Sequence, residues 1–397
     1  MAADESGSAA PALASRRSLR PLWQLDPAIR HLNHGAFGAC PLEILEEQAE
    51  WRRRMEANPT RFFMVELPKA FRRTAEEIAP WLGTRPERLA FIENVTAGTS
   101  AVLRSLDFMP GDEILTTDHV YNAVRNTLRY VASRTGAVAI EAPMPEPLAN
   151  SQQALDVITA SITARTRLIV IDHIASASAA TFPVAEIAAA ARARGIPILV
   201  DGAHAPGSID LDIDAIGADW YVGNCHKWLC APRGAAFIVV ADRPTFEIHP
   251  LAISHAYGQG FPAEFDKIGT RDASAWLSIP AAIRFHERLG GAALRCRNRG
   301  LALEIAQAIT RDVGYAAAAA DGLCQSLIAL KLPLARAAAR EDAGAVHDYL
   351  YDQHGIETGV TVLKGALHLR FSVAAYNEAS DYAGLGAATR DALEQLA

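Results

Sequence analysis

The chain has 397 residues, more than one compact hydrophobic core usually accommodates, so two domains are expected. Half of the residues are hydrophobic, and 38 basic against 45 acidic residues give a net charge of −7. This balance excludes the basic surface typical of a nucleic-acid-binding protein, and no run of 18 apolar residues predicts a membrane span.

Residues 1–18 are rich in Ala and Ser and are predicted to form a disordered tail. Ser15-Arg16-Arg17 is similar to a twin-arginine export motif. The stretch from Leu19 to Leu32 that follows contains charges and prolines instead of an apolar segment, so no signal peptide is predicted. The five cysteines are odd in number and lack regular close pairing, which favours reduced thiols and a cytoplasmic location.

From about residue 41 to residue 240, strand-like runs alternate with helical ones. A helix is expected to begin at Pro41, and an alanine-rich helix is expected from Val184 to Arg194. Short apolar runs predict strands at residues 89–92, 113–115, 168–171, 198–200 and 236–240. Continuous apolar strands joined by helices are typical of a mostly parallel sheet buried on both faces, so the predicted class is α/β.

The pattern changes after about residue 269. A helix is predicted from Ser274 to Leu289. Strands are predicted at 327–332 and 367–372, with helical stretches at 343–353 and after residue 377. This pattern predicts a smaller C-terminal α+β domain over residues 269–397. Residues 19–268, including an N-terminal arm, are then the large domain.

Two residues suggest a particular chemistry. Asp201 ends the apolar run 196–200 and is expected at the carboxyl edge of a parallel strand, where ligands bind in open α/β sheets. A carboxylate there is suited to hold a pyridine nitrogen protonated, which makes pyridoxal 5′-phosphate (PLP) an electron sink. Lys227 follows 26 residues later, and a lysine amine among apolar residues is available for Schiff-base formation and proton transfer. Each residue alone is more often structural, so the prediction depends on the ordered set.

Three segments around these residues, Val200 to Gly207, Asp219 to Tyr221 and His226 to Leu229, resemble the class V aminotransferase family of fold-type I PLP enzymes. The likeness extends from His31 to Asn377, and within the family it is greatest to isopenicillin N epimerase and its relatives. The resemblance implies a PLP cofactor, an α-amino-acid substrate and a homodimer with shared active sites. No metal, nucleic-acid or membrane partner is expected.

The resemblance also assigns roles to residues at the cofactor. Asp201 is expected to pair with the pyridine nitrogen, His204 to hydrogen-bond the phenolic oxygen O3′, and Lys227 to form the Schiff base. Ser176 falls where relatives often have an asparagine near the same oxygen. The segment from Glu93 to Ser100 follows an apolar run and opens a helix, so its amides are suited to bind an anion, although a plain helix cap is the ordinary alternative. The implied phosphate contacts are Thr96, Ala97, Asn224 and His226, with Thr270 contributed to the neighbouring subunit.

Other assignments concern the ring and the substrate. An aromatic residue is expected to stack on the pyridine, and both Tyr121, the preferred residue, and His119 are candidates. Arg370 lies in an alternating run that resembles the family's Arg-x-Ser, and its planar guanidinium suits a substrate carboxylate. Asn33 and Arg233 are further candidates for substrate contacts, Arg233 for a second acidic group.

The sequence leaves the reaction open. No cysteine occurs from Gln325 to Ala397, so the persulfide mechanism of cysteine desulfurases is not expected. Epimerisation needs Cα deprotonation by Lys227 in the external aldimine and return of a proton from the opposite face, by Tyr121 or His119. Cβ–S elimination needs Lys227 and a leaving group, and transamination needs Lys227 to move the proton to the cofactor. A catalytically inactive binding protein is disfavoured, because Asp201, Lys227 and Arg370 are all present.

Overall fold

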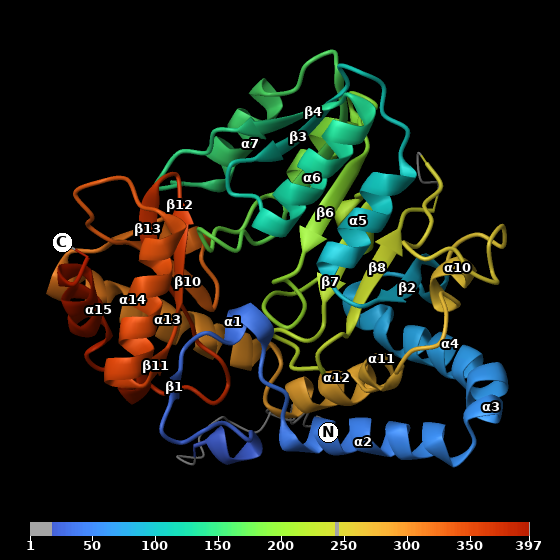
Figure 1. Ribbon diagram of the computed structural model, residues 1–397, viewed down its shortest axis with the longest axis horizontal. Helices are drawn as coiled ribbons and strands as arrows, with labels where there is room; N and C mark the ends of the chain where they lie inside the picture. Colours follow the sequence, from blue (N-terminus) through green and yellow to red (C-terminus); the bar gives the residue numbers. More distant parts are fainter. Residues whose placement is uncertain (1–17, 243–245, 397) are drawn as a thin grey trace, which may run out of the picture.

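A computed structural model describes residues 18–242 and 246–396, and residues 1–17 of the predicted tail 1–18 lie outside them. Seven strands form one large sheet in the order β2-β8-β7-β6-β5-β3-β4 (Figure 1). Their bounds are β2 (Leu89–Ile92), β3 (Glu113–Thr117), β4 (Val138–Ala142), β5 (Thr166–Asp172), β6 (Ile198–Gly202), β7 (Trp220–Asn224) and β8 (Ala236–Val240). Strands β4, β3, β5, β6 and β7 are parallel, whereas β8 is antiparallel to both of its neighbours. The predicted α/β class and mostly parallel sheet are therefore confirmed.

Helices precede, connect and follow the strands of this sheet. Their bounds are α1 (His34–Phe37), α2 (Leu42–Ala57), α3 (Pro59–Arg61), α4 (Leu67–Ile78), α5 (Val95–Ser105), α6 (Asn122–Thr135), α7 (Ser151–Ala160), α8 (Val184–Arg192), α9 (Ile213–Ile216), α10 (Ala263–Asp266), α11 (Ser274–Leu277) and α12 (Ile279–Arg288). No helix in the described ranges is long and apolar enough to cross a membrane.

The large sheet is covered on both faces because its strand residues alternate between two cores. Leu168 and Val170 of β5 belong to the core that includes α5 and α6, whereas Ile169 and Ile171 belong to the core that includes α8. On β6, Leu199 joins the α5 and α6 side. Even-numbered residues of β5 and odd-numbered residues of β6 therefore share one face of the sheet. This is the face that α5 and α6 cover (Figure 1).

The C-terminal part is built on a smaller antiparallel sheet in the order β12-β13-β10-β9. Its elements are α13 (Ala292–Val313), β9 (Ala316–Ala317), β10 (Leu327–Lys331), α14 (Arg340–His354), β11 (Ile356–Glu357), β12 (Gly359–Leu363), β13 (Ala366–Ser372) and α15 (Leu385–Glu394). A short parallel pairing joins β11 to β1 (Arg30–His31) of the N-terminal arm. A smaller α+β region is observed, and we propose residue 269 as its boundary.

The differences from the predicted elements have local causes. The helix predicted from Ser274 to Leu289 is divided at Ser278, just before Pro280 in the first turn of α12. Strands β4 and β7 were not predicted. The residues of β4 are largely half-exposed, and β7 ends in Gly223 and Asn224, so neither forms a long apolar run.

Candidate active site

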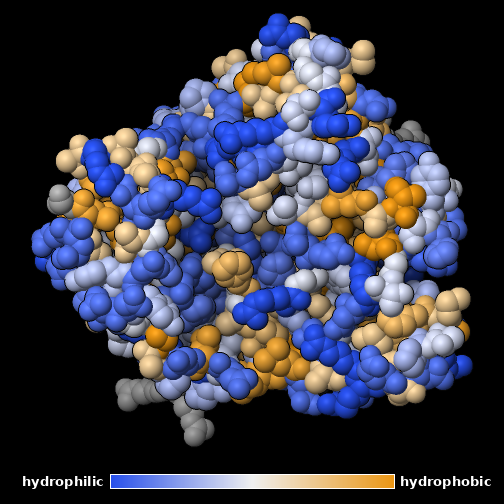
Figure 2. Space-filling view, in the orientation of Figure 1, coloured by the Kyte–Doolittle hydropathy of each residue, from blue (hydrophilic) through white to orange (hydrophobic). Residues whose placement is uncertain are grey.

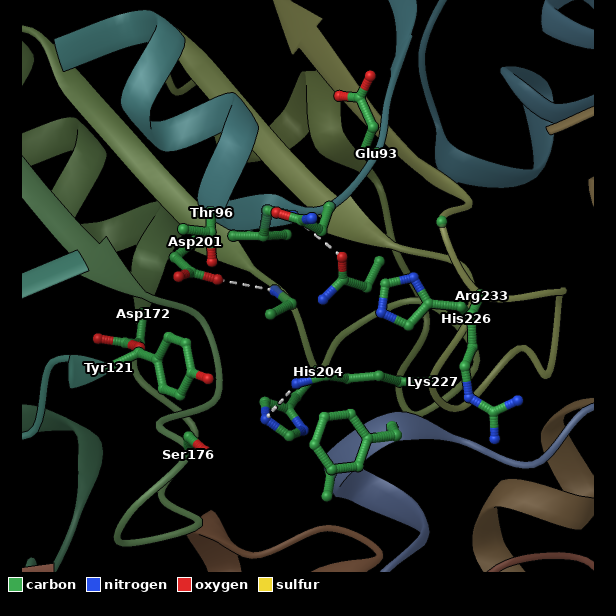
Figure 3. Close-up of a pocket in the computed structure, with 17 residues that line it drawn as sticks. Glu93, Thr96, Tyr121, Asp172, Ser176, Asp201, His204, His226, Lys227 and Arg233 are labelled. Carbon is green, nitrogen blue, oxygen red and sulfur yellow. Dashed lines mark hydrogen bonds between the residues drawn. The ribbon is translucent and has the colours of Figure 1, made fainter. Parts of the chain in front are cut away.

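A cavity of about 490 Å³ lies at the carboxyl ends of β5, β6 and β7 (Figure 3). The space-filling view shows a mostly hydrophilic hollow beside α1, between the large and small sheets (Figure 2). The predicted site residues that line the cavity are Thr96, Tyr121, Ser176, Asp201, His204, Asn224, His226, Lys227 and Arg233. Those that lie outside its lining are Asn33, Ala97, His119, Thr270 and Arg370.

Asp201 and Lys227 both extend into this cavity. Asp201 lies near the end of β6, and its Oδ1 accepts a hydrogen bond from the Ala203 amide at 2.9 Å. Burial raises the pKa of Asp201 to about 6, although the nearby Lys227 charge opposes this shift. Burial also lowers the pKa of Lys227 to about 8, and the charge of Arg370 acts in the same direction. A larger fraction of this amine is therefore neutral near neutral pH than for an ordinary exposed lysine, and the neutral form can act as a nucleophile or base.

The position of the His204 proton follows from its partners. Trp228 Nε1 donates to His204 Nδ1 at 3.3 Å, and an indole nitrogen can only donate. Burial lowers the pKa of His204 well below its ordinary value, so the ring is neutral. Its single proton is therefore on Nε2, which lies 3.1 Å from Lys227 Nζ. This arrangement gives the cavity a fixed N–H donor beside the lysine amine.

Helix α5 begins at one end of the cavity, where Thr96 is part of the lining. Two of its first amides are already paired, because Val95 N–H donates to Asn224 Oδ1 and Ala97 N–H donates to the capping Asn94. The predicted Ala97 contact with a phosphate is thus not available in this structure, and the capping interaction is present instead. Within the described part of the chain, the Thr96 amide and hydroxyl have no hydrogen-bond partner, so they remain available to an anion.

His226 lies at the same end as α5. Its Nδ1 lies 3.1 Å from the Ala235 carbonyl, which can only accept, so Nδ1 is protonated. Burial lowers the pKa of His226 to about 4. The Nε2 of this neutral ring is an acceptor, and it becomes a donor to an anion only when His226 takes up a second proton.

The structure separates the two candidates for the stacking ring. Tyr121 precedes α6, lines the cavity and lies across it from Lys227 (Figure 3). His119 is fully buried, packs edge-on against Phe182 and does not line this cavity. Burial lowers the pKa of His119 to about 4. The geometry therefore favours Tyr121.

Arg370 belongs to a second cavity of about 370 Å³, which shares Phe37, Tyr121, Ser176 and Lys227 with the first. Its Nη1 donates to the Ser176 carbonyl and hydroxyl, at 3.0 and 2.7 Å, and its Nη2 donates to Asn33 Oδ1 at 3.3 Å.

The guanidinium of Arg370 is buried but lacks a countercharge. No carboxylate among the described residues pairs with it, and its Nε has no hydrogen-bond partner there. A buried cation without a countercharge is costly and favours an anionic ligand. In this structure the hydrogen bonds to Ser176 and Asn33 hold Arg370 in position.

The last two predicted residues are Arg233 and Thr270. Arg233 lines the first cavity and donates to the Gly38 carbonyl at 3.1 Å. Thr270 is exposed and lies outside the lining of its own chain's cavity. An exposed position leaves Thr270 accessible to another subunit.

Two residues were missed by the sequence reasoning. Asp172 ends β5, is buried and lines the first cavity, in the same relation to its strand as Asp201. The rule that placed Asp201 at a strand edge could have identified it. Trp228 belongs to the Lys227 segment, but its role depends on the partner His204, which sequence spacing does not reveal.

The donor set at this site fits PLP. The lysine amine, the neutral His204 donor and the buried Asp201 carboxyl suit the aldehyde carbon, the phenolic oxygen and the ring nitrogen of the cofactor, respectively. The unpaired Thr96 groups at the start of α5 suit its phosphate.

Comparisons with known proteins agree with this fit. The family model for Aminotransferase class-V matches residues 32–381. Isopenicillin N epimerase from Streptomyces clavuligerus is 33% identical over 403 residues, which cover 97% of this chain and 99% of that protein. L-cysteine desulfhydrase from Arabidopsis thaliana is 27% identical over 402 residues, which cover 93% of this chain and 88% of that protein. The solved structure of the cystine C–S lyase C-DES with cysteine persulfide superimposes with a TM-score of 0.77 at 22% identity, covering 91% of this chain and 97% of that one.

The structural likeness confirms the predicted fold-type I architecture. The family model covers most of the chain, and the epimerase from Streptomyces clavuligerus aligns over nearly the full length of both proteins. The resemblance inferred from the sequence is therefore confirmed. The chain belongs to the aminotransferase class-V family of PLP-dependent enzymes.

Proposed function

We propose that this enzyme inverts the configuration at Cα of an α-amino acid, as an isopenicillin N epimerase-like protein. The observation that carries the proposal is the position of the Tyr121 hydroxyl, across the cavity from Lys227 (Figure 3). Inversion needs a proton removed from one face of Cα and returned to the other. Two acid–base groups on opposite sides of one cavity meet that requirement.

Several residues would hold the cofactor in this proposal. Asp201 pairs with the ring nitrogen, and His204 donates through Nε2 to the phenolic oxygen in place of its contact with Lys227. Thr96, Asn224 and a protonated His226 bind the phosphate. When bound, PLP withdraws electrons from Cα of the amino acid and so acidifies its proton.

Arg370 orients the substrate. Its unpaired, buried guanidinium binds the α-carboxylate, while Ser176 and Asn33 fix its direction. Lys227, which lines both cavities, then removes the Cα proton from one face. The Tyr121 hydroxyl returns a proton to the other face. His119 also lines the second cavity, but its ring is buried against Phe182, so we assign this step to Tyr121.

The second cavity accommodates the substrate side chain. Its volume of about 370 Å³ exceeds what the side chain of cysteine needs, and it continues from Arg370 to Asp118, Arg125 and Lys364. The lining is polar and charged at that far end. This supports a side chain that is longer than that of cysteine and carries polar groups.

The test is incubation of the holoenzyme with single enantiomers of polar α-amino acids in D₂O. We expect both inversion and deuterium at Cα. Tyr121→Phe is expected to slow inversion roughly 10²-fold or more, because it removes one acid–base group, while deuterium exchange with retention continues through Lys227. Tyr130→Phe, an exposed tyrosine on α6, is the matched control. Equal loss of inversion and exchange in Tyr121→Phe would contradict the assignment.

A second candidate is Cβ–S elimination, favoured by the similarity to the Arabidopsis thaliana L-cysteine desulfhydrase. This reaction uses Lys227 and needs no acid on the opposite face. Release of sulfide and pyruvate from L-cysteine, without inversion of any amino acid, would support it. A 2-oxo acid formed only with a second amino-group acceptor would indicate transamination.

We further propose that the active form is a homodimer, with Thr270 reaching the phosphate site of the other subunit. Phe37 lines both cavities and is 74% exposed, and Thr270 is exposed as well. Large exposed apolar side chains at a cavity rim support coverage by a partner. Sedimentation of the holoenzyme is expected to give a dimer, and a fully active monomer would contradict this.

The five cysteines are unpaired, which supports a reducing compartment such as the cytoplasm.

A further inference from the structure

A second carboxyl group lies beside Asp201 at the edge of the large sheet. Asp172 is the last residue of β5, and its register partner on β6 is Asp201. The alternation of core residues along both strands puts the two side chains on the same face, the one covered by α5 and α6. Neighbouring strands are about 4.8 Å apart. The two carboxyl groups are therefore adjacent, and both line the first cavity (Figure 3).

The Asp172 carboxyl group is buried and incompletely paired. Only 3% of Asp172 is exposed. The main-chain N–H groups of Asp172 and Tyr121 lie near the carboxyl group and favour its charged form, but burial outweighs them. Its Oδ2 has no hydrogen-bond partner in the described part of the chain. A carboxylate with a bare buried oxygen is costly, whereas a neutral carboxylic acid at the same place is much less so.

The charges that face Asp172 come from three elements. Asp201 faces it from β6, Arg125 from α6, and Lys227 from the loop after β7. Arg125 offers little compensation, because its Nε and Nη2 already donate to Glu141. The nearby uncharged titratable groups are Tyr121, His173 and Tyr221. Burial, and then the charge of Asp201, raise the pKa of Asp172 well above its ordinary value.

We propose that Asp172 and Asp201 form a carboxyl pair that holds one proton, with Asp172 as the neutral member. Asp201 then carries the single negative charge that a single protonated ring nitrogen requires. Asp172 is a positioning residue: its carboxyl group faces the Tyr121 main-chain N–H and so supports the start of α6 beside the cavity. The inference rests on the proposed roles of Asp201 and Tyr121.

The first test uses the apoenzyme and so requires no cofactor chemistry. The folded protein holds the Asp172 proton more tightly than the unfolded chain, whose aspartate pKa is about 3.9. Stability that depends on this proton is therefore lost as pH rises from about 4 through the raised pKa. We expect the urea midpoint of the wild type to fall, relative to that of Asp172→Asn, as the pH rises above about 4. The exposed Asp352→Asn is the matched control and is expected to run parallel to the wild type.

The second test uses the holoenzyme. Asp172→Asn keeps a neutral group with an acceptor oxygen facing the Tyr121 amide, so kcat is expected to stay within about threefold of the wild type near neutral pH. Asp172→Ala leaves that amide without an acceptor, and kcat is expected to fall on the order of tenfold. A role limited to filling space would make the two variants similar.

The outcomes separate this inference from the proposed function. If Asp172→Asn follows the pH dependence of wild-type apoenzyme stability, or loses activity as severely as Asp172→Ala, Asp172 is not a neutral acid and the inference is wrong. If the stability result holds while no substrate is inverted, the carboxyl pair stands and the proposed epimerisation fails. An Asp172→Ala variant that does not fold leaves the comparison between Asp172→Asn and the wild type decisive.

Discussion

Replacing Lys227 with alanine is expected to abolish Cα proton exchange and to leave PLP bound only through its non-covalent contacts. The lysine amine is buried, its pKa is lowered to about 8, and Lys227 lines both cavities. Loss of the general base alone costs roughly 10²–10⁴-fold in rate, and loss of the covalent link adds to that. The measurement is the rate of deuterium incorporation at Cα. Lys267→Ala, at an exposed lysine, is the control and is expected to keep wild-type rates.

The second large effect is expected for Arg370→Ala. Removing one partner of a buried, charge-assisted pair costs about 2–5 kcal/mol. We therefore expect kcat/KM to fall roughly 10²-fold or more, mainly through a higher KM. Cofactor content should stay normal, because Arg370 lies outside the first cavity. Steady-state kinetics and the visible spectrum of the purified variant test both parts.

Arg370→Lys sharpens this prediction. An ammonium keeps the charge but lacks the planar fork that Ser176 and Asn33 orient, so only part of the lost kcat/KM is expected to return. Arg233→Ala, at the rim of the first cavity, is the informative comparison. A normal KM in Arg370→Ala together with a raised KM in Arg233→Ala would transfer the carboxylate contact to Arg233.

Local patterns were sufficient to predict most of the large sheet. Strands β2 and β8 were predicted with the bounds observed, because each is a short apolar run between polar turns. Asp201 was placed correctly at a strand edge for the same reason. Helix α14 and the strands β10 and β13 were also predicted, with bounds that differ by a few residues, whereas α13 and β12 were not predicted.

Features that depend on contacts distant in sequence could not be predicted. The Ala97 amide looked free because helix capping by Asn94 and binding of an anion use the same short segment. His119 and Tyr121 are two residues apart, and only the packing of His119 against Phe182 separates their environments. The pairing of Asp172 with Asp201 depends on strand register, which spacing along the chain does not give.

The central claim is that Lys227 carries PLP at the carboxyl edge of the large sheet. Borohydride treatment of the holoenzyme, followed by proteolysis and mass spectrometry, tests it most directly, because reduction fixes the cofactor on the lysine that binds it. We predict a single labelled peptide in which Lys227 is modified, and no labelled peptide from Lys227→Ala. Labelling of Lys364, which lies in the second cavity, or of the exposed Lys267 in place of Lys227 would contradict the account.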